Sequence, residues 1–231
     1  THIISGIDHI AFLLCLLLLA TNMRQTIFLI TGFTFGHSVT LALAALEIAL
    51  PNSAVVEAII GFTIALVAAE SILARQHLMK KAGGVVALAL LILAIIGGNL
   101  PPQAWAGLII FTLCYGFLIR TTDDTHRFAP LMTLLFGAVH GFGFGGVLHD
   151  IGLPPAQIIQ ALFGFNIGVE IGQIAIIATI FISRAILSRL LSGRVLAKFS
   201  GGITTPIAIK DIAACFLTAY GVFLFIQRSL F

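Results

Sequence analysis

The stretch GGVVALALLILAIIGG, residues 83–98, contains neither a charged nor a polar side chain. A helix needs about 20 predominantly apolar residues to cross the ~30 Å hydrocarbon layer of a membrane, and comparable stretches recur along the whole chain. They are continuous, whereas the strands of a transmembrane β-barrel alternate apolar and polar residues. The sequence therefore predicts an all-α fold, a polytopic transmembrane helical bundle.

The composition supports this class of protein. Of 231 residues, 59% are hydrophobic and 9% are charged, whereas a soluble domain carries about 25% charged residues. The formal net charge is +3, but the basic residues lie in short segments between apolar stretches, so they indicate topology and not nucleic-acid binding. Cys15, Cys114 and Cys215 are isolated in apolar runs, which argues against disulfides, thiolate metal sites and c-type haem.

Eight apolar segments are expected to span the membrane as a single domain over residues 1–231. Turn-forming residues separate several of them, as at Pro51 and Pro101. The predicted spans are residues 2–21, 26–49, 54–74, 83–99, 103–119, 129–149, 156–184 and 208–227.

The Lys and Arg residues predict the orientation, because cytoplasmic loops retain positive charge. Eleven of the twelve lie in alternate loops, after spans one, three, five and seven. We therefore expect a multi-pass protein of the bacterial cytoplasmic (inner) membrane with both termini outside. Residues 185–200 are expected to form a basic amphipathic connector on the cytoplasmic surface, or a solvated loop. The chain starts without Met, so we expect a preceding signal peptide or extracytoplasmic segment, or a trimmed sequence.

The first group of ionisable residues is HIISGIDH, residues 2–9. His2 and His9 are seven residues apart, so they share one face of a helix, and Asp8 is their neighbour. Imidazole and carboxylate together suit a divalent ion such as Ni, Co or Zn. The alternative is that Asp8 only caps the start of the helix.

Two further histidines lie within predicted spans, where ionisable residues are costly and usually mark a site. His37 follows a Phe-Gly pair in span two. His140 lies in a glycine-rich part of span six, which predicts either close helix contact or a helix break beside a cavity. Each is a candidate metal ligand or a hydrogen-bonded packing residue. Ser38 is expected to support the site or to bond to a neighbouring helix.

Spans seven and three carry the remaining polar residues of interest. Asn166, Glu170 and Gln173 share one face of span seven, and a functional role is expected for Glu170. Glu57 lies near the outer end of span three and could extend the outer cluster. Glu70 lies near the inner end and could serve as an ion way-station or could simply reach water.

Two expectations concern the framework around these residues. Gly164, Gly168 and Gly172 form a stripe of small residues in span seven, which predicts tight packing against another helix. Spans four, five and eight have no ionisable residue in their interiors and are expected to be scaffold.

These motifs, in this order, resemble the HupE/UreJ family of membrane proteins, bacterial permeases associated with nickel or cobalt supply. The resemblance rests on H-x5-D-H at residues 2–9, FTFGHSVTLALA at 33–44, Val56-Glu57, GAVHGFGF at 137–144 and FNIGVEIGQ at 165–173. It implies uptake of a metal ion, with candidate ligands His2, Asp8, His9, His37, His140 and Glu170. Glu57, Glu70, Asn166, Gln173 and Ser38 are the expected supporting residues.

The chain departs from the family pattern at one point. Better-known members carry a second motif with two histidines and a glutamate near the glycine-rich span, whereas this span has only His140 in its GAVHGFGF stretch. The chain therefore resembles a divergent branch found in longer proteins with an extracytoplasmic domain.

Three functions follow from these observations. The first is secondary transport of a divalent ion, Ni or Co, with Zn as a further candidate substrate. The second is an intramembrane zinc-dependent hydrolase with Glu170 as general base, and the third is a non-catalytic metal-binding subunit of a membrane complex. The expected partners are the lipid bilayer, the metal ion, and a second copy of the chain or another membrane subunit, with no nucleic acid.

Overall fold

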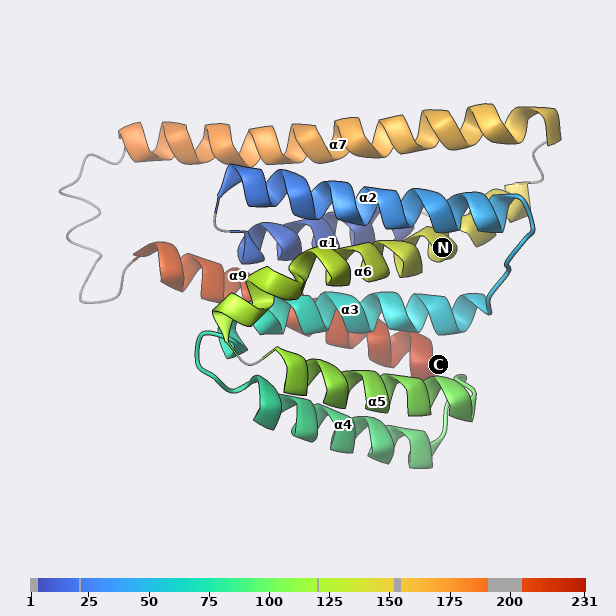
Figure 1. Ribbon diagram of the computed structural model, residues 1–231, viewed down its shortest axis with the longest axis horizontal. Helices are drawn as coiled ribbons and strands as arrows, with labels where there is room; N and C mark the ends of the chain where they lie inside the picture. Colours follow the sequence, from blue (N-terminus) through green and yellow to red (C-terminus); the bar gives the residue numbers. More distant parts are fainter. Residues whose placement is uncertain (1–3, 21, 120, 152–154, 191–204) are drawn as a thin grey trace.

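The computed structural model describes residues 4–20, 22–119, 121–151, 155–190 and 205–231 (Figure 1). Within these ranges the chain forms helices and no strand, as the apolar pattern predicts. The helices are α1 (Ile4–Leu19), α2 (Met23–Ala45), α3 (Ser53–Leu73), α4 (Met79–Ile96), α5 (Pro102–Leu118), α6 (Thr122–Ile151), α7 (Pro155–Leu190) and α9 (Thr205–Leu230).

These helices form a multi-pass membrane protein. Five of them, α2, α3, α4, α7 and α9, contain a segment long and apolar enough to cross a membrane, and α1 and α5 are shorter apolar helices. Helix α6 is longer than α1 and α5 but more polar than either, with Asp123 and Asp124 in its first turn. Large apolar side chains such as Ile95, Phe163 and Phe216 are exposed on the bundle surface, where lipid rather than water is the compatible solvent.

The helix ends follow from local chemistry. The side-chain oxygen of Asn22 accepts a hydrogen bond from the backbone N–H of Gln25 at 2.8 Å, and that of Asn52 accepts one from the backbone N–H of Val55 at 3.2 Å. These bonds cap the starts of α2 and α3. Pro102 occupies the first turn of α5, and Gly97 ends α4 with a φ of 92°, which favours glycine.

The described helices lie at the predicted spans, with three main extensions. Helix α6 begins at Thr122, seven residues before the predicted start of span six at residue 129. Helix α7 continues to Leu190, so residues 185–190 of the predicted connector prolong this helix. Residues 191–200 of the connector lie outside the described ranges. Helix α9 continues to Leu230, three residues beyond the predicted end of span eight, and this extension brings Arg228 into the helix.

Consecutive helices alternate in direction, so the start of α1 and the end of α9 lie at the same end of the bundle (Figure 1). An ion pair between Asp8 and Arg228 joins them there. We call this the terminal end. The opposite end holds an ion pair between Arg75, which follows the end of α3, and Asp211 of α9, and we call it the basic end.

Helices α2 and α6 run in the same direction and pack on glycine. A Cβ atom added to Gly36 would lie 2.1 Å from a backbone oxygen of α6. Added to Gly137 or Gly141, it would lie 2.1 or 2.2 Å from a backbone oxygen of α2. Only glycine permits this approach, and it fixes the helix positions that carry His37 and His140.

Helix α7 packs against α2 at the edge of the bundle (Figure 1). Gly164, Gly168 and Gly172 have no atom within 4 Å of an added Cβ among the described residues. The expected tight packing of this glycine stripe is therefore not present within the described part of the chain. The polar face of α7 contacts α2 instead.

Candidate functional site

Three histidines from three helices meet inside the bundle. The ring centroid of His9 on α1 lies 5.1 Å from that of His37 on α2 and 5.4 Å from that of His140 on α6. His37 and His140 are completely buried, at 0% exposure. The structure thus brings together three of the predicted ligands from residues far apart in the sequence; His2 lies outside the described ranges.

Aromatic side chains form one wall of this cluster. Phe12 stacks on Phe33 with 4.9 Å between ring centroids, and their centroids lie 4.6 and 5.2 Å from that of His140. On the α7 side, Phe165 stacks on His37 at 6.0 Å. The phenylalanine rings carry no polar atom, so they cannot hydrogen-bond to the nitrogens of the histidine rings.

The hydrogen bonds of His140 define its tautomer. Its Nδ1 lies 2.8 Å from the backbone oxygen of Phe136, and because a carbonyl oxygen only accepts, Nδ1 carries the proton. Nε2 is then left with its lone pair, and it has no hydrogen-bond partner in the described part of the chain. Metal-binding histidines usually have this arrangement, with one nitrogen donating to a carbonyl or carboxylate and the other binding the ion.

His37 also has unused hydrogen-bonding capacity. Both of its ring nitrogens are buried, and neither makes a hydrogen bond of standard geometry with the described residues; its polar neighbour on α7 is Asn166. A buried polar atom without a partner costs about 1–3 kcal/mol. A ligand that accepts nitrogen lone pairs would remove this cost.

The three rings are not yet arranged as a metal centre. Among the described residues, no group of three or more His, Cys, Asp or Glu side chains is placed to hold a metal ion. The ring planes of His9 and His37 are inclined at 79° and those of His9 and His140 at 77°, which is compatible with a shared ion. It is therefore the positions of the nitrogens that must change before they can share one ion.

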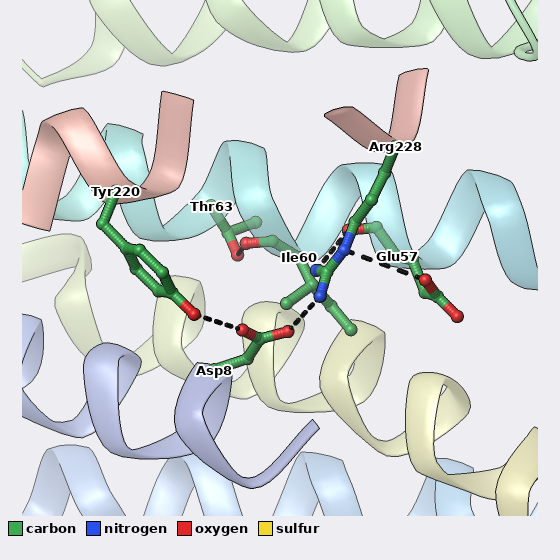
Figure 2. Close-up of polar contacts among 6 residues, drawn as sticks. All are labelled: Asp8, Glu57, Ile60, Thr63, Tyr220 and Arg228. Carbon is green, nitrogen blue, oxygen red and sulfur yellow. Dashed lines mark hydrogen bonds and ion pairs between the residues drawn. The ribbon is translucent and has the colours of Figure 1, made fainter. Parts of the chain in front are cut away.

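Asp8 points toward α9 (Figure 2). Its Oδ2 accepts a hydrogen bond from Nη2 of Arg228 at 2.7 Å, and its Oδ1 accepts one from the Tyr220 hydroxyl at 3.2 Å. Asp8 is only 3% exposed. The alternative, in which Asp8 only caps the start of the helix, does not account for either of these contacts.

Arg228 also contacts Glu57 on α3 (Figure 2). Its Nη1 donates to the Glu57 carbonyl oxygen at 3.1 Å, and its Nε lies 3.8 Å from the Glu57 carboxylate. Span eight was expected to be scaffold, and the structure adds that α9 supplies the two partners of Asp8, Arg228 and Tyr220. One sequence signal marks Arg228: it is the only basic residue outside the four basic loops.

The polar face of α7 is divided between α2 and the surface. The Ser38 hydroxyl donates to Asn166 Oδ1 at 2.8 Å, and the Thr34 hydroxyl donates to Gln173 Oε1 at 3.2 Å. Glu170, between these contacts on the helix, is exposed and has no hydrogen bond or ion pair with another described residue. The structure brings the two amides to α2 but does not bring Glu170 to the histidines.

Glu70 lies at the basic end and does not reach open water. It is 2% exposed and accepts a hydrogen bond from the Tyr115 hydroxyl of α5. It lines a cavity of about 200 Å³ together with Thr125, His126 and Lys210. Helix α5, which was expected to be scaffold, therefore also supplies a polar partner, the Tyr115 hydroxyl, to Glu70.

The Glu70–Tyr115 contact gives a stability prediction. Tyr115→Phe should lower the free energy of unfolding by about 1–3 kcal/mol, because a buried carboxyl loses its partner. Thermal unfolding in detergent measures this. With Glu70→Ala already in place, the same change should cost much less, and an equal cost in both backgrounds would show that the pair is not coupled.

Comparison with known protein families gives a match over most of the chain. The family model described as HupE / UreJ protein matches residues 1–100 and residues 83–220. No curated protein and no solved structure matches the chain.

Proposed function

The chain belongs to the HupE/UreJ family, and on this premise we propose that it is a secondary transporter that takes up a divalent transition-metal ion, Ni²⁺ or Co²⁺. The family is associated with nickel and cobalt transport. The observation that carries the proposal is the meeting of His9, His37 and His140 inside an apolar bundle. Neutral imidazole binds Ni, Co and Zn well, so Zn²⁺ is a further candidate substrate.

The available nitrogen atoms support a transient binding site. His140 Nε2 and both nitrogens of His37 are buried without a standard hydrogen bond from the described residues. An ion that has shed its water could bind them after the rings rotate. Because the described residues of the site are not already arranged around an ion, binding to them costs some reorganisation, and a transporter must also release its substrate.

The loop charges assign the orientation of the chain, and uptake would then run from the terminal end to the basic end. In the sequence, eleven of the twelve Lys and Arg residues belong to the segments predicted to follow spans one, three, five and seven. These segments connect helices at the basic end, which we assign to the cytoplasm of a bacterium by the positive-inside rule. The terminal end, with Asp8 and Glu57, then faces outside. Ions would enter there, pass the histidines and leave past Glu70 at the basic end.

Transport by the purified chain tests this proposal. Proteoliposomes that contain the protein and an internal metal-sensitive dye should accumulate Ni²⁺ or Co²⁺ well above protein-free liposomes, and should not accumulate Mg²⁺, which prefers oxygen ligands. Accumulation of Zn²⁺, measured in the same assay, shows how this third candidate compares with Ni²⁺ and Co²⁺. No difference between protein-containing and empty liposomes for any of these transition metals would contradict the proposal.

A further inference from the structure

Arg228 holds a position that the family assignment does not cover, because the matched residues end at 220. Its guanidinium lies between two carboxylates from different helices, Asp8 on α1 and Glu57 on α3 (Figure 2). Its side chain is 13% exposed. A permanent cation is therefore held at the terminal end, next to the histidine cluster.

The two carboxylates differ in their environment. The Asp8 side chain is 5% exposed and the Glu57 side chain is 52% exposed. A buried carboxylate needs a cation or several donors nearby, whereas an exposed one is stabilised by water. Arg228 can therefore leave Asp8 and remain beside Glu57, provided that another cation takes its place on Asp8.

The histidines supply a reason for such an exchange. Asp8 directly precedes His9, whose ring lies 5.1 and 5.4 Å from those of His37 and His140. A divalent ion that moves from the terminal end toward these rings meets a carboxylate that already has a cation. Two cations cannot share this buried carboxylate without strong repulsion.

We infer that Arg228 is a tethered competitor of the transported ion: it occupies Asp8 in the metal-free protein and moves toward Glu57 when the ion binds Asp8 and the histidines. The inference rests on the proposed function, since it requires a divalent cation as substrate. It makes Arg228 a residue that sets the affinity of the site without contacting the ion. The competing interpretation is a permanent clamp that only joins α9 to α1.

Metal titration of the purified full chain distinguishes the tethered competitor from the permanent clamp. In calorimetry with NiCl₂, Arg228→Gln should bind Ni²⁺ about tenfold more tightly than the unmodified chain, a change within the usual coupling between contacting residues. Arg228→Lys is the matched control: it keeps the positive charge but loses the fork of donors, so the competition for Asp8 persists and the affinity for Ni²⁺ should stay within about threefold. A clamp predicts that Arg228→Gln binds Ni²⁺ equally well or more weakly, and this result would overturn the inference.

A second background shows whether the effect passes through Asp8. In Asp8→Asn, which removes the contested charge, Arg228→Gln should no longer increase the affinity for Ni²⁺. An equal increase in both backgrounds would mean that Arg228 acts only through general charge repulsion, against the exchange proposed here.

A measurement on the unmodified chain covers the case in which Arg228→Gln does not fold. Phenylglyoxal modifies accessible guanidinium groups, and mass spectrometry can follow Arg228 separately from Arg75, which pairs with Asp211 at the basic end. Saturating Ni²⁺ should speed the modification of Arg228 at least about threefold, because its partner Asp8 is lost, and leave Arg75 unchanged. An unchanged rate at Arg228 in protein shown to bind Ni²⁺ would overturn the inference.

The two levels of proposal fail differently. If the unmodified chain and Arg228→Gln both bind no Ni²⁺, Co²⁺ or Zn²⁺, the proposed function fails, and the inference fails with it. If the unmodified chain binds and transports the ion but Arg228→Gln does not bind it more tightly, only the tethered competitor is lost.

Discussion

His37→Leu is expected to reduce Ni²⁺ or Co²⁺ uptake into proteoliposomes by at least about tenfold, since even loss of a group that only supports a metal ligand costs about 10–100-fold. The same change should leave thermal stability unchanged or raise it. The reason is that both ring nitrogens of His37 are buried without a standard hydrogen bond among the described residues, and replacing such a group by an apolar one of similar size is neutral or stabilising.

This combination distinguishes a substrate ligand from a packing histidine. A histidine kept for its hydrogen bonds would lose stability on conversion to leucine, with transport falling only as far as folding does. His77→Asn is the control, because His77 is exposed at a φ of 55°, which asparagine adopts readily. Its uptake should stay within about twofold of the unmodified chain; unchanged uptake in His37→Leu would remove His37 from the proposed pathway.

Gly137→Ala is expected to lower the free energy of unfolding by about 3 kcal/mol or more, at the upper end of the usual cost of overpacking. The added Cβ would lie 2.1 Å from the Phe33 backbone oxygen, so α2 and α6 would have to separate. Because His37 and His140 lie on these helices, the same variant should lose uptake. Size-exclusion profiles and thermal unfolding in detergent measure the first effect, and the liposome assay measures the second.

Gly168→Ala is the matched control on α7. No atom of the described residues lies within 4 Å of the added Cβ, and alanine is favoured over glycine within a helix by about 1 kcal/mol. This variant should therefore be as stable as the unmodified chain or slightly more stable. Equal stability of Gly137→Ala and Gly168→Ala would show that the close approach of α2 and α6 does not exist in the folded protein.

Much of the site was predictable because its residues break the apolar pattern. His37 and His140 are conspicuous in a membrane span, since burial of an imidazole there is costly. Of the two arrangements that the glycines around His140 left open, a close helix contact and a helix break, the structure has the contact, with α2. Glu170 breaks the pattern in the same way, yet it is exposed on α7. Polarity identified unusual residues but not which helix each would face.

The sequence by itself determined the class of fold and the helix segments, because hydropathy and helix ends depend on residues close together in the chain. It also determined that the two ends of the bundle differ from each other in charge, because the Lys and Arg residues are concentrated in alternate predicted loops. Only the tertiary structure decided the partners: α2 lies beside α6, α1 beside α9, and Asp8 bonds to Arg228 rather than to the histidines. In a membrane all helices have similar apolar surfaces, so adjacency depends on backbone fit at glycines and on single polar contacts, which become visible only when the helices are packed.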